Sequence, residues 1–381
     1  MLTDIATNLA EDDKPTVTVV TSRQLYQKAD AGLGKKAIID GVEIWRVWTS
    51  SFGRSTVLGR SLDYLSFYIS CFFRLLIITH KGDIIIAKTD PPLISVIACL
   101  VSRAKGARSI NWLQDLFPEI AKELQVITER QLLYRLLEVL RNWSLERATQ
   151  NIVIGRLMRK KLIDMGISES KITYIPNWSH RMSSLPKEQN PLSNSWGLRD
   201  KFVVGYSGNL GRGHDVSTIS RTIKLLAREE KIAFLFIGGG SGLIELKETL
   251  GDCCANVIFK PYQDRSLLNE ALSVADIHII SLKSELEALM VPSKVYGILS
   301  VGKPILYIGN KNGEIATLVE RNFCGYVISE GEAEVLTERI ILLSSDAKTL
   351  DTMGMNARTL FDNLYDFPHA EKKWRNLLCS V

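Results

Sequence analysis

Residues 202–214 read FVVGYSGNLGRGH, an apolar run that leads into a glycine-rich loop. An apolar run of this length that ends at glycine is typical of a buried β-strand. The glycines of the loop let backbone amides come close to an anion, and Arg212 can make two parallel hydrogen bonds to a phosphate. Ligands of an open α/β sheet bind beyond the carboxyl ends of its strands. The stretch therefore predicts an α/β fold with a phosphate-binding loop at that edge, although a plain turn is the alternative for the loop.

Strand-like apolar runs recur along the chain and alternate with segments of helical periodicity. They form two series that are separated by a region without such runs. This βα rhythm is typical of parallel sheets that are covered by helices on both faces. The first series comprises residues 16–21, 44–47, 84–87, 109–112 and 151–154, and the second comprises 202–206, 233–237, 257–259, 277–280, 304–307 and 325–328.

The length of the chain predicts two domains. With 381 residues it exceeds what one hydrophobic core usually serves. Residues 176–197 contain three prolines and many Asn and Ser, which is linker composition. We expect an N-terminal domain over residues 1–190, a C-terminal domain over 191–365, and a final helix within 366–381.

Composition indicates a folded protein in a reducing compartment. Hydrophobic residues make up 46% and charged residues 23%, which leaves no room for long disordered segments. The six cysteines are scattered without a C-x-x-C pair and predict neither disulfides nor a zinc site. Residues 1–14 carry four acids and lack the apolar segment of a secretory signal. We therefore expect a cytoplasmic location.

Charge and apolar patterning leave a membrane contact open. The surplus of five cations is too small to indicate a nucleic-acid partner. Residues 101–161 hold twelve Lys or Arg against six acids, which suits phosphate or anionic lipid but also an ordinary solvated surface. We expect residues 62–79 to form a well-buried helix, because Asp63 and Arg74 interrupt a membrane-spanning pattern. The alternative is an interfacial helix that attaches the protein peripherally to the inner face of the plasma membrane.

Three further stretches follow strands of the second series. Residues 238–242, GGGSG, precede a helical pattern, where a helix N-terminus attracts anions, although a plain turn is the alternative. In residues 291–297, VPSKVYG, Lys294 stands in a first helical turn, where the helix dipole repels a cation unless a ligand such as a diphosphate is bound. A surface lysine is the alternative. Glu314 can accept a sugar hydroxyl, or can satisfy the dipole of its own helix.

In the first domain, residues 111–119 read NWLQDLFPE and follow a predicted strand. Asp115 can contact the reacting sugar or an acceptor hydroxyl across the cleft. Alternatively, it caps the helix that follows.

Residues 111–119, 206–214, 291–297, 302–304 and 313–316 together resemble glycosyltransferase family 4, and more narrowly its N-acetylfucosamine-type transferases of surface polysaccharide assembly. The resemblance implies the GT-B architecture, an α/β fold of two Rossmann-like domains that face each other across a cleft. It implies that the second domain holds the nucleotide-sugar, that the first recognises the acceptor, and that the final helix crosses back to the first domain.

The resemblance also implies the roles of site residues. Asp115, Arg212 and Lys294 are the expected catalytic residues, and the loop 260–262 contacts the base. Many relatives carry a pair of glutamates where this chain has Leu289 and Gly297, so contacts to the ribose and donor sugar differ. The expected nucleotide-sugar-binding residues are Gly208, Asn209, Leu210, Gly211, Arg212, His214, Gly239, Tyr262, Val291, Pro292, Ser293, Lys294, Glu314 and Ile315.

By resemblance, the activity is transfer of a sugar from a nucleotide diphosphate-sugar, UDP-linked, to a sugar or polyprenyl-linked acceptor. Retention at the anomeric carbon and the absence of any metal or cofactor are implied as well, and the chain has no D-x-D motif. Two alternatives stay open: a nucleotide-sugar 2-epimerase, and a non-catalytic partner subunit that has lost the glutamate pair. A dehydrogenase is not expected, because no intact G-x-G-x-x-G opens either series.

Overall fold

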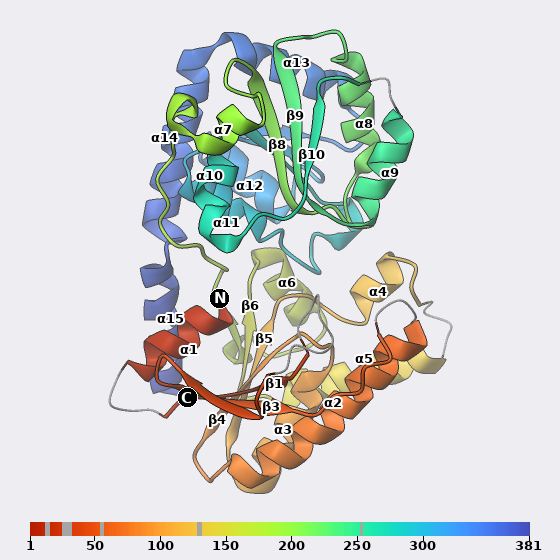
Figure 1. The fold of residues 1–381 in the computed structure, drawn as a ribbon. Coiled ribbons are helices and arrows are strands. Elements are labelled where there is room, and N and C mark those ends of the chain that lie inside the picture. Colours follow the sequence, from red (N-terminus) through yellow and green to blue (C-terminus); the bar gives the residue numbers. More distant parts are fainter. Residues whose placement is uncertain (12–15, 25–32, 54–56, 128–131, 252–253) are drawn as a thin grey trace.

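The chain forms two α/β lobes in a computed structural model that describes residues 1–381 except 12–15, 25–32, 54–56, 128–131 and 252–253. Figure 1 shows the N-terminal lobe below and the C-terminal lobe above. The last two helices run along one side of the molecule from the upper lobe to the lower one. The α/β class predicted from the sequence is confirmed, whereas the domain boundaries at residues 190 and 365 stay predictions.

Six parallel strands form the sheet of the C-terminal lobe, in the order β10-β9-β8-β11-β12-β13. The chain starts in the middle with β8, moves outward to β10, and returns to the other side of β8 with β11. Adjacent residues Val203 and Val204 point to opposite faces and are both buried, because helices cover both faces. Each predicted run of the second series overlaps one strand. The strands are β8 (Phe202–Asn209), β9 (Ile232–Gly239), β10 (Val257–Lys260), β11 (Ile277–Ser281), β12 (Ile305–Ile308) and β13 (Gly325–Ile328).

The helices of this lobe begin where the sequence provides a start signal. Asp215 caps α8, since its carboxylate accepts a hydrogen bond from the backbone N–H of Thr218 at 3.0 Å. Ile219 and Ile223 lie one turn apart on the buried side of this helix. The helices are α7 (Pro191–Ser195), α8 (Val216–Leu225), α9 (Ser241–Leu250), α10 (Leu268–Ser273), α11 (Lys294–Ser300), α12 (Glu314–Arg321), α13 (Ala333–Ser345) and α14 (Ala347–Leu364), with short 3-10 turns at Lys187–Gln189, Arg265–Leu267 and Ser284–Leu286.

The N-terminal lobe holds two sheets instead of one. Four parallel strands form the order β4-β5-β6-β7, and three strands form the order β1-β3-β2. The strands are β1 (Thr18–Ser22), β2 (Lys36–Ile39), β3 (Val42–Val47), β4 (Ile84–Lys88), β5 (Arg108–Leu113), β6 (Gln150–Val153) and β7 (Ile172–Tyr174); the helices are α1 (Leu2–Ala10), α2 (Val57–Ile78), α3 (Ile94–Lys105), α4 (Glu119–Glu123), α5 (Leu132–Arg147) and α6 (Arg156–Asp164), and a 3-10 turn covers Glu169–Lys171.

Strand β2 was not predicted, and a local signal marks it. It pairs antiparallel with β3 through a tight turn whose central residues, Asp40 and Gly41, have φ angles of 48° and 77°. An Asp-Gly pair suits a two-residue hairpin in which both central residues have positive φ. The dipeptide therefore indicates the hairpin even though β2 itself is short and mostly exposed.

The prediction that residues 62–79 form a well-buried helix is wrong in part. The helix exists as α2, but its outward side exposes large apolar side chains such as Ile69, which is 51% exposed. Its inward side instead holds Asp63, whose carboxylate accepts hydrogen bonds from the backbone N–H groups of Phe52 and Gly53 at 3.0 and 3.1 Å. The helix is therefore apolar on the side away from the core.

The C-terminal helix α15 (Phe367–Ser380) packs against the first lobe. Trp374 lies edge-on to Trp112 of β5, with ring centroids 4.8 Å apart, and Trp112 stacks on Trp178 at 5.9 Å. Arg375 of α15 also donates a hydrogen bond of 2.7 Å to Asn8 of α1. Both chain termini thus stabilise the β4-β5-β6-β7 sheet.

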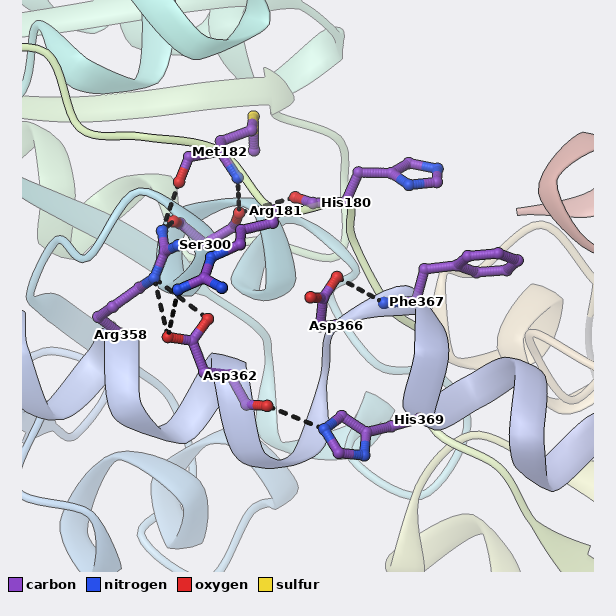
Figure 2. Close-up of polar contacts among 9 residues, drawn as sticks. All are labelled: His180, Arg181, Met182, Ser300, Arg358, Asp362, Asp366, Phe367 and His369. Atoms are coloured by element: carbon purple, nitrogen blue, oxygen red, sulfur yellow. Dashed lines mark hydrogen bonds and ion pairs between the residues drawn. The ribbon is translucent and has the colours of Figure 1, made fainter.

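The linker and the start of α15 meet at one polar junction, shown in Figure 2. The guanidinium of Arg358 on α14 donates to the backbone carbonyls of Met182 and Ser300, and its Nε lies 3.2 Å from Asp362. Arg181 donates to the same carboxylate at 3.2 Å. The junction fastens the linker to α11 and α14, where the chain passes between the lobes.

Candidate active site

Three of the predicted phosphate-binding stretches, residues 206–214, 238–242 and 291–297, lie at the same edge of the C-terminal sheet. They follow β8, β9 and β11, and the carboxyl ends of neighbouring parallel strands meet at one edge. Gly208 pairs with Gly238 and Asn209 with Gly239 where β8 and β9 end. The backbone N–H of Leu210 then donates to the carbonyl of Gly239 at 2.8 Å. The first two loops therefore form one braced unit.

Close backbone approach explains the glycines of the second loop. Gly238 has a φ of 131°, and a Cβ there would lie 2.3 Å from the carbonyl oxygen of Gly208. Gly240 has a φ of 115°, and a Cβ there would lie 2.4 Å from the Asn209 side chain and from the Leu210 carbonyl oxygen. Any side chain would force the two loops apart, so these glycines are required by packing before any ligand is considered.

Lys294 is a half-buried cation of the site. It opens α11, and its ammonium group lies 3.7 Å from the centre of the Tyr206 ring and donates to the Tyr206 hydroxyl. Its side chain passes over Gly208, because a Cβ at that glycine would lie 3.9 Å from the Lys294 Cε. Burial lowers the pKa of Lys294 to about 7. Contact with an aromatic face compensates only part of the lost hydration.

His214 lies beside this pair as a neutral group. Its Nδ1 is 2.5 Å from the backbone carbonyl oxygen of Ser281, and its ring stands edge-on to Tyr206 at 6.0 Å. Burial lowers the pKa of His214 to about 4, and the charge of Lys294 adds to this effect. At neutral pH the positive charge of the site therefore comes from Lys294 and from Arg212 and Lys283, which are exposed at the rim.

Tyr262 covers the second loop. It follows β10 and is 54% exposed. Its ring lies close to Gly238 and Gly239, because a Cβ at these glycines would lie 3.2 and 3.3 Å from its ring carbons. An exposed aromatic face above glycines that end a strand suits a stacked base. The contact of loop 260–262 with the base stays a prediction.

Among the described residues, a hollow of about 470 Å³ is lined from both lobes. Glu123 and Gln125 line it from the first lobe, and Arg212, His214 and Lys283 line it from the second. The side chains of the other predicted site residues, such as those at the start of α11, lie outside this lining. Arg212 and His214 therefore border both the hollow and the braced loops.

Asp115 lies where the two lobes meet. Its backbone forms an isolated antiparallel bridge with Met290, and the N–H of Leu116 donates to the carbonyl of Leu289 at 2.9 Å. Burial raises the pKa of the Asp115 carboxyl to about 6, against a hydrogen bond from Thr89 that lowers it. The alternative that Asp115 caps the following helix does not hold, because α4 begins after Pro118.

The residues that precede α11 also lie at the contact between the two lobes. Val291 and Pro292 are buried, and Val291 approaches the first lobe so closely that a Cβ at Gly155 would lie 2.9 Å from its Cγ2. Ser293 is exposed at the start of α11. Gly297, one turn into the helix, faces away from the loops, because a Cβ there would contact Leu272 at 3.2 Å.

Glu314 reaches across to the first lobe. Its Oε2 accepts hydrogen bonds from the backbone N–H groups of Arg156 and Leu157 at 2.8 and 3.4 Å, and its Oε1 lies 3.4 Å from the Arg156 side chain. It therefore caps α6. Ile315, next to it, is buried in the core. The predicted contact of Glu314 with a nucleotide or sugar stays a prediction.

Glu287 is a buried carboxyl that the sequence reasoning missed. Its Oε1 accepts a hydrogen bond from Tyr307, and its Oε2 accepts one from the backbone N–H of Glu314 at 3.2 Å. Burial raises the pKa of Glu287 to about 7. The signal was present, since Glu287 follows β11 and so lies near the edge where ligands bind. Gly313 is glycine because a Cβ there would lie 2.2 Å from the Glu287 carboxylate.

Comparison with known proteins defines the class. Residues 2–178 match the family model "Glycosyl transferase 4-like domain", and residues 189–360 match "Glycosyl transferases group 1". The chain is therefore a glycosyltransferase that carries these two domains in this order. The narrower N-acetylfucosamine-type assignment stays a prediction.

Relatives and solved structures agree with this class. The chain is 28% identical over 250 residues to the probable glycosyltransferase WbjE of Pseudomonas aeruginosa; the match covers 65% of this chain and 62% of that protein. It is 25% identical over 285 residues to the putative colanic acid biosynthesis glycosyl transferase WcaI of Escherichia coli, covering 73% of this chain and 70% of that protein. The structure of HepE from Anabaena in complex with UDP and glucose superposes with a TM-score of 0.74 at 17% identity, covering 100% and 95% of the two chains. These likenesses support the GT-B fold.

Proposed function

We propose that the protein transfers a sugar from a UDP-sugar to a sugar or lipid-linked acceptor during polysaccharide biosynthesis, with retention at the anomeric carbon. HepE, whose fold is similar, was solved in complex with UDP and glucose, and WcaI is named for colanic acid biosynthesis. The observation that carries the proposal is the position of Lys294. A half-buried lysine in a first helical turn, above Gly208 of β8 and with a lowered pKa, is an unfavourable charge until a diphosphate faces it.

Arg212, Lys294 and the exposed backbone amides of the loops would hold the diphosphate. During transfer, the bond between the anomeric carbon and the diphosphate oxygen breaks, and the acceptor hydroxyl oxygen bonds to the same face of that carbon. The negative charge that develops on the leaving diphosphate is stabilised by the two cations and the helix N-termini. Because these groups supply the charge, the proposal requires no metal ion.

Asp115 is the candidate general base, which would accept the proton that the acceptor hydroxyl loses. Its backbone bridges to Met290 at the contact between the lobes, and a carboxyl pKa of about 6 leaves Asp115 mostly ionised at neutral pH, so that it can accept this proton. Transfer from the cytoplasmic side of the membrane is part of the proposal, since nucleotide-sugars and the free cysteines among the described residues both fit that compartment.

The first test is a thermal-shift panel of UDP, GDP and ADP. A ligand that binds only the folded state at about 100 times its Kd stabilises it by about 2.7 kcal/mol, so UDP should raise the melting temperature by several degrees. Arg212→Ala should reduce the affinity for UDP roughly 10- to 100-fold, since a charge-assisted contact is lost. Arg221→Ala is the matched control, because Arg221 is also an exposed arginine of this lobe and pairs with Glu334 on α13.

Other outcomes would replace the proposal. Binding of UDP without transfer or hydrolysis of any UDP-sugar would favour the non-catalytic partner subunit, which the loss of the glutamate pair at Leu289 and Gly297 makes a specific alternative. Formation of a 2-epimer without an acceptor would indicate an epimerase. An anomeric configuration in the product opposite to that of the donor would refute retention.

A further inference from the structure

Helix α2 (Val57–Ile78) turns its apolar side away from the core. Phe67 and Cys71 pack against Val47 of the small sheet, and Asp63 is buried on the same side. The opposite side carries large apolar side chains at spacings of three and four residues, which places them on one face. They are Leu58 (71% exposed), Leu62 (38%), Leu65 (53%), Ile69 (51%), Phe73 (59%) and Ile77 (69%).

Two neighbouring helices continue this surface. Figure 1 shows α2, α3 and α5 side by side at the lower edge of the N-terminal lobe, and α3 contacts both of the others. Leu100 of α3 is exposed, and the first turns of α5 expose four more apolar side chains. We call this set of exposed side chains on the three helices the apolar face. Its members on α5 are Leu132, Leu133, Leu136 and Val139.

The charges around the apolar face are mostly positive. Among the described residues of the three helices, the exposed charged side chains are Arg60, Arg103, Arg135 and Arg147, against the single acid Glu146. A face that combines exposed apolar side chains with arginines is typical of a surface that lies in the headgroup region of an anionic bilayer. A protein partner would have to supply acids at several points around the same face.

The length of α2 alone does not make it a membrane-spanning helix. Its apolar segment Leu58–Ile78 is long enough to cross a bilayer by length and composition. However, Asp63 is hydrogen-bonded to the loop that holds Phe52 and Gly53, and the helix packs on β1, β3 and α3. An inserted α2 would break these contacts and place an unpaired carboxylate in hydrocarbon. The helix can instead lie along the interface with its apolar side toward the lipid.

We propose that the apolar face of α2, α3 and α5 docks the N-terminal lobe on the surface of an anionic lipid bilayer. The inference rests on the proposed function, because docking would bring a lipid-linked acceptor to the lobe that carries Asp115. The exposed aromatic side chains Trp48 and Phe52, in the segment just before α2, are suited to the headgroup region as well.

Sedimentation with vesicles of phosphatidylglycerol and phosphatidylcholine tests the proposal on the full chain. The triple variant Leu65→Gln, Ile69→Gln, Phe73→Gln should bind these vesicles roughly 100-fold more weakly, because three apolar side chains no longer leave water. The double variant Arg103→Gln, Arg135→Gln should lose roughly tenfold on the same vesicles and little on pure phosphatidylcholine.

The matched control is Leu225→Gln, Ile244→Gln, Ile341→Gln, which alters three exposed apolar side chains of the C-terminal lobe. It should bind vesicles like the unaltered protein. Equal vesicle binding by both triple variants, or failure of the unaltered protein to bind, overturns the proposal. A concentration-dependent dimer that the first triple variant alone abolishes, without vesicle binding, overturns it in favour of a second copy of the chain.

The melting temperature and its response to UDP separate this proposal from the proposed function. The first triple variant changes only exposed side chains, so both should match those of the unaltered protein. Vesicle binding without any response to a nucleotide would refute the proposed function and leave the docking surface standing. A response to UDP without vesicle binding would do the reverse.

Discussion

Lys294 gives the sharpest prediction, because its ionisation should be linked to nucleotide binding. Burial lowers the pKa of its ammonium group from 10.5 to about 7 in the unliganded protein. A diphosphate beside it would favour the charged form and raise that pKa again. Above about pH 7, binding must therefore be accompanied by uptake of a proton, and the affinity for UDP should fall as the pH rises.

The magnitude follows from linkage. One unit of pKa corresponds to about 1.4 kcal/mol, so the Kd for UDP should rise up to about tenfold per pH unit between about pH 7 and pH 9. Lys294→Met removes the titrating group. At about pH 7 this variant should bind UDP roughly 10- to 100-fold more weakly than the unaltered protein. Its Kd should then change little with pH, so the two curves should converge toward about pH 9.

Isothermal titration calorimetry in buffers of different ionisation enthalpy measures both the Kd and the proton uptake. His214 does not interfere in this range, because its pKa of about 4 keeps it neutral. Parallel pH curves for the two proteins, or no proton uptake at about pH 8, would refute the assignment of Lys294 to the diphosphate.

The lowered pKa of Lys294 also predicts how the stability of the unliganded protein depends on pH. The pKa of Lys294 is lower in the folded than in the unfolded state, so the unfolded state binds more protons between about pH 7 and 10.5. The stability of the unliganded protein therefore rises with pH across that window through this group. At about pH 7, Lys294→Met should be at least as stable as the unaltered protein, because it removes a partly buried charge that folding disfavours.

Three further predictions concern the braced loops and the lobe contact. Gly238→Ala should destabilise the protein by about 2–4 kcal/mol in chemical denaturation and abolish UDP binding, because its Cβ would lie 2.3 Å from a carbonyl oxygen; full stability would contradict the close approach. Glu314→Gln should cost about 1 kcal/mol of stability and leave the Kd for UDP within a factor of about two, since the carboxylate caps α6; a large loss of UDP affinity would instead favour the sequence-based role. Asp115→Asn should lower kcat with the Kd for UDP unchanged and remove an inflection near pH 6 from the pH profile of kcat, whereas an unaltered profile would exclude Asp115 as the proton acceptor.

The regular part of the fold could be predicted because its signals are local. The runs at residues 233–237 and 277–280 are apolar on both faces, as strands covered by helices on both sides must be, and both lie in strands of the six-stranded sheet. The burial of α2 could not be predicted in the same way. Hydrophobicity alone does not tell whether an apolar side chain faces the core or the outside, and Asp63 on the inward side reverses the usual pattern.

The candidate site divides in a similar manner. Glycines stand out in the sequence because they destabilise strands and helices unless the backbone must approach another group closely. Lys294 stands out because the helix dipole repels a cation in the first turn unless a ligand is bound there. The partners of Glu314 are not visible in the sequence, since Arg156 and Leu157 are more than 150 residues away and belong to the other lobe. Contacts between lobes depend on their relative placement, which no local pattern encodes.

The structure connects the lobe contact to the proposed donor site through two helices. Leu289 and Met290, which hold the loop of Asp115, lie only a few residues before Lys294 at the start of α11. Glu314, which caps α6 of the first lobe, opens α12 at the same edge of the sheet. A diphosphate bound to Lys294 would therefore contact the same segment, residues 289–294, that contacts the N-terminal lobe. Where the family resemblance leads one to expect a glutamate pair, this chain has a backbone contact at Leu289 and a closely packed glycine at 297. In the proposed donor site, the basic groups and the braced loops would therefore supply the contacts to the donor.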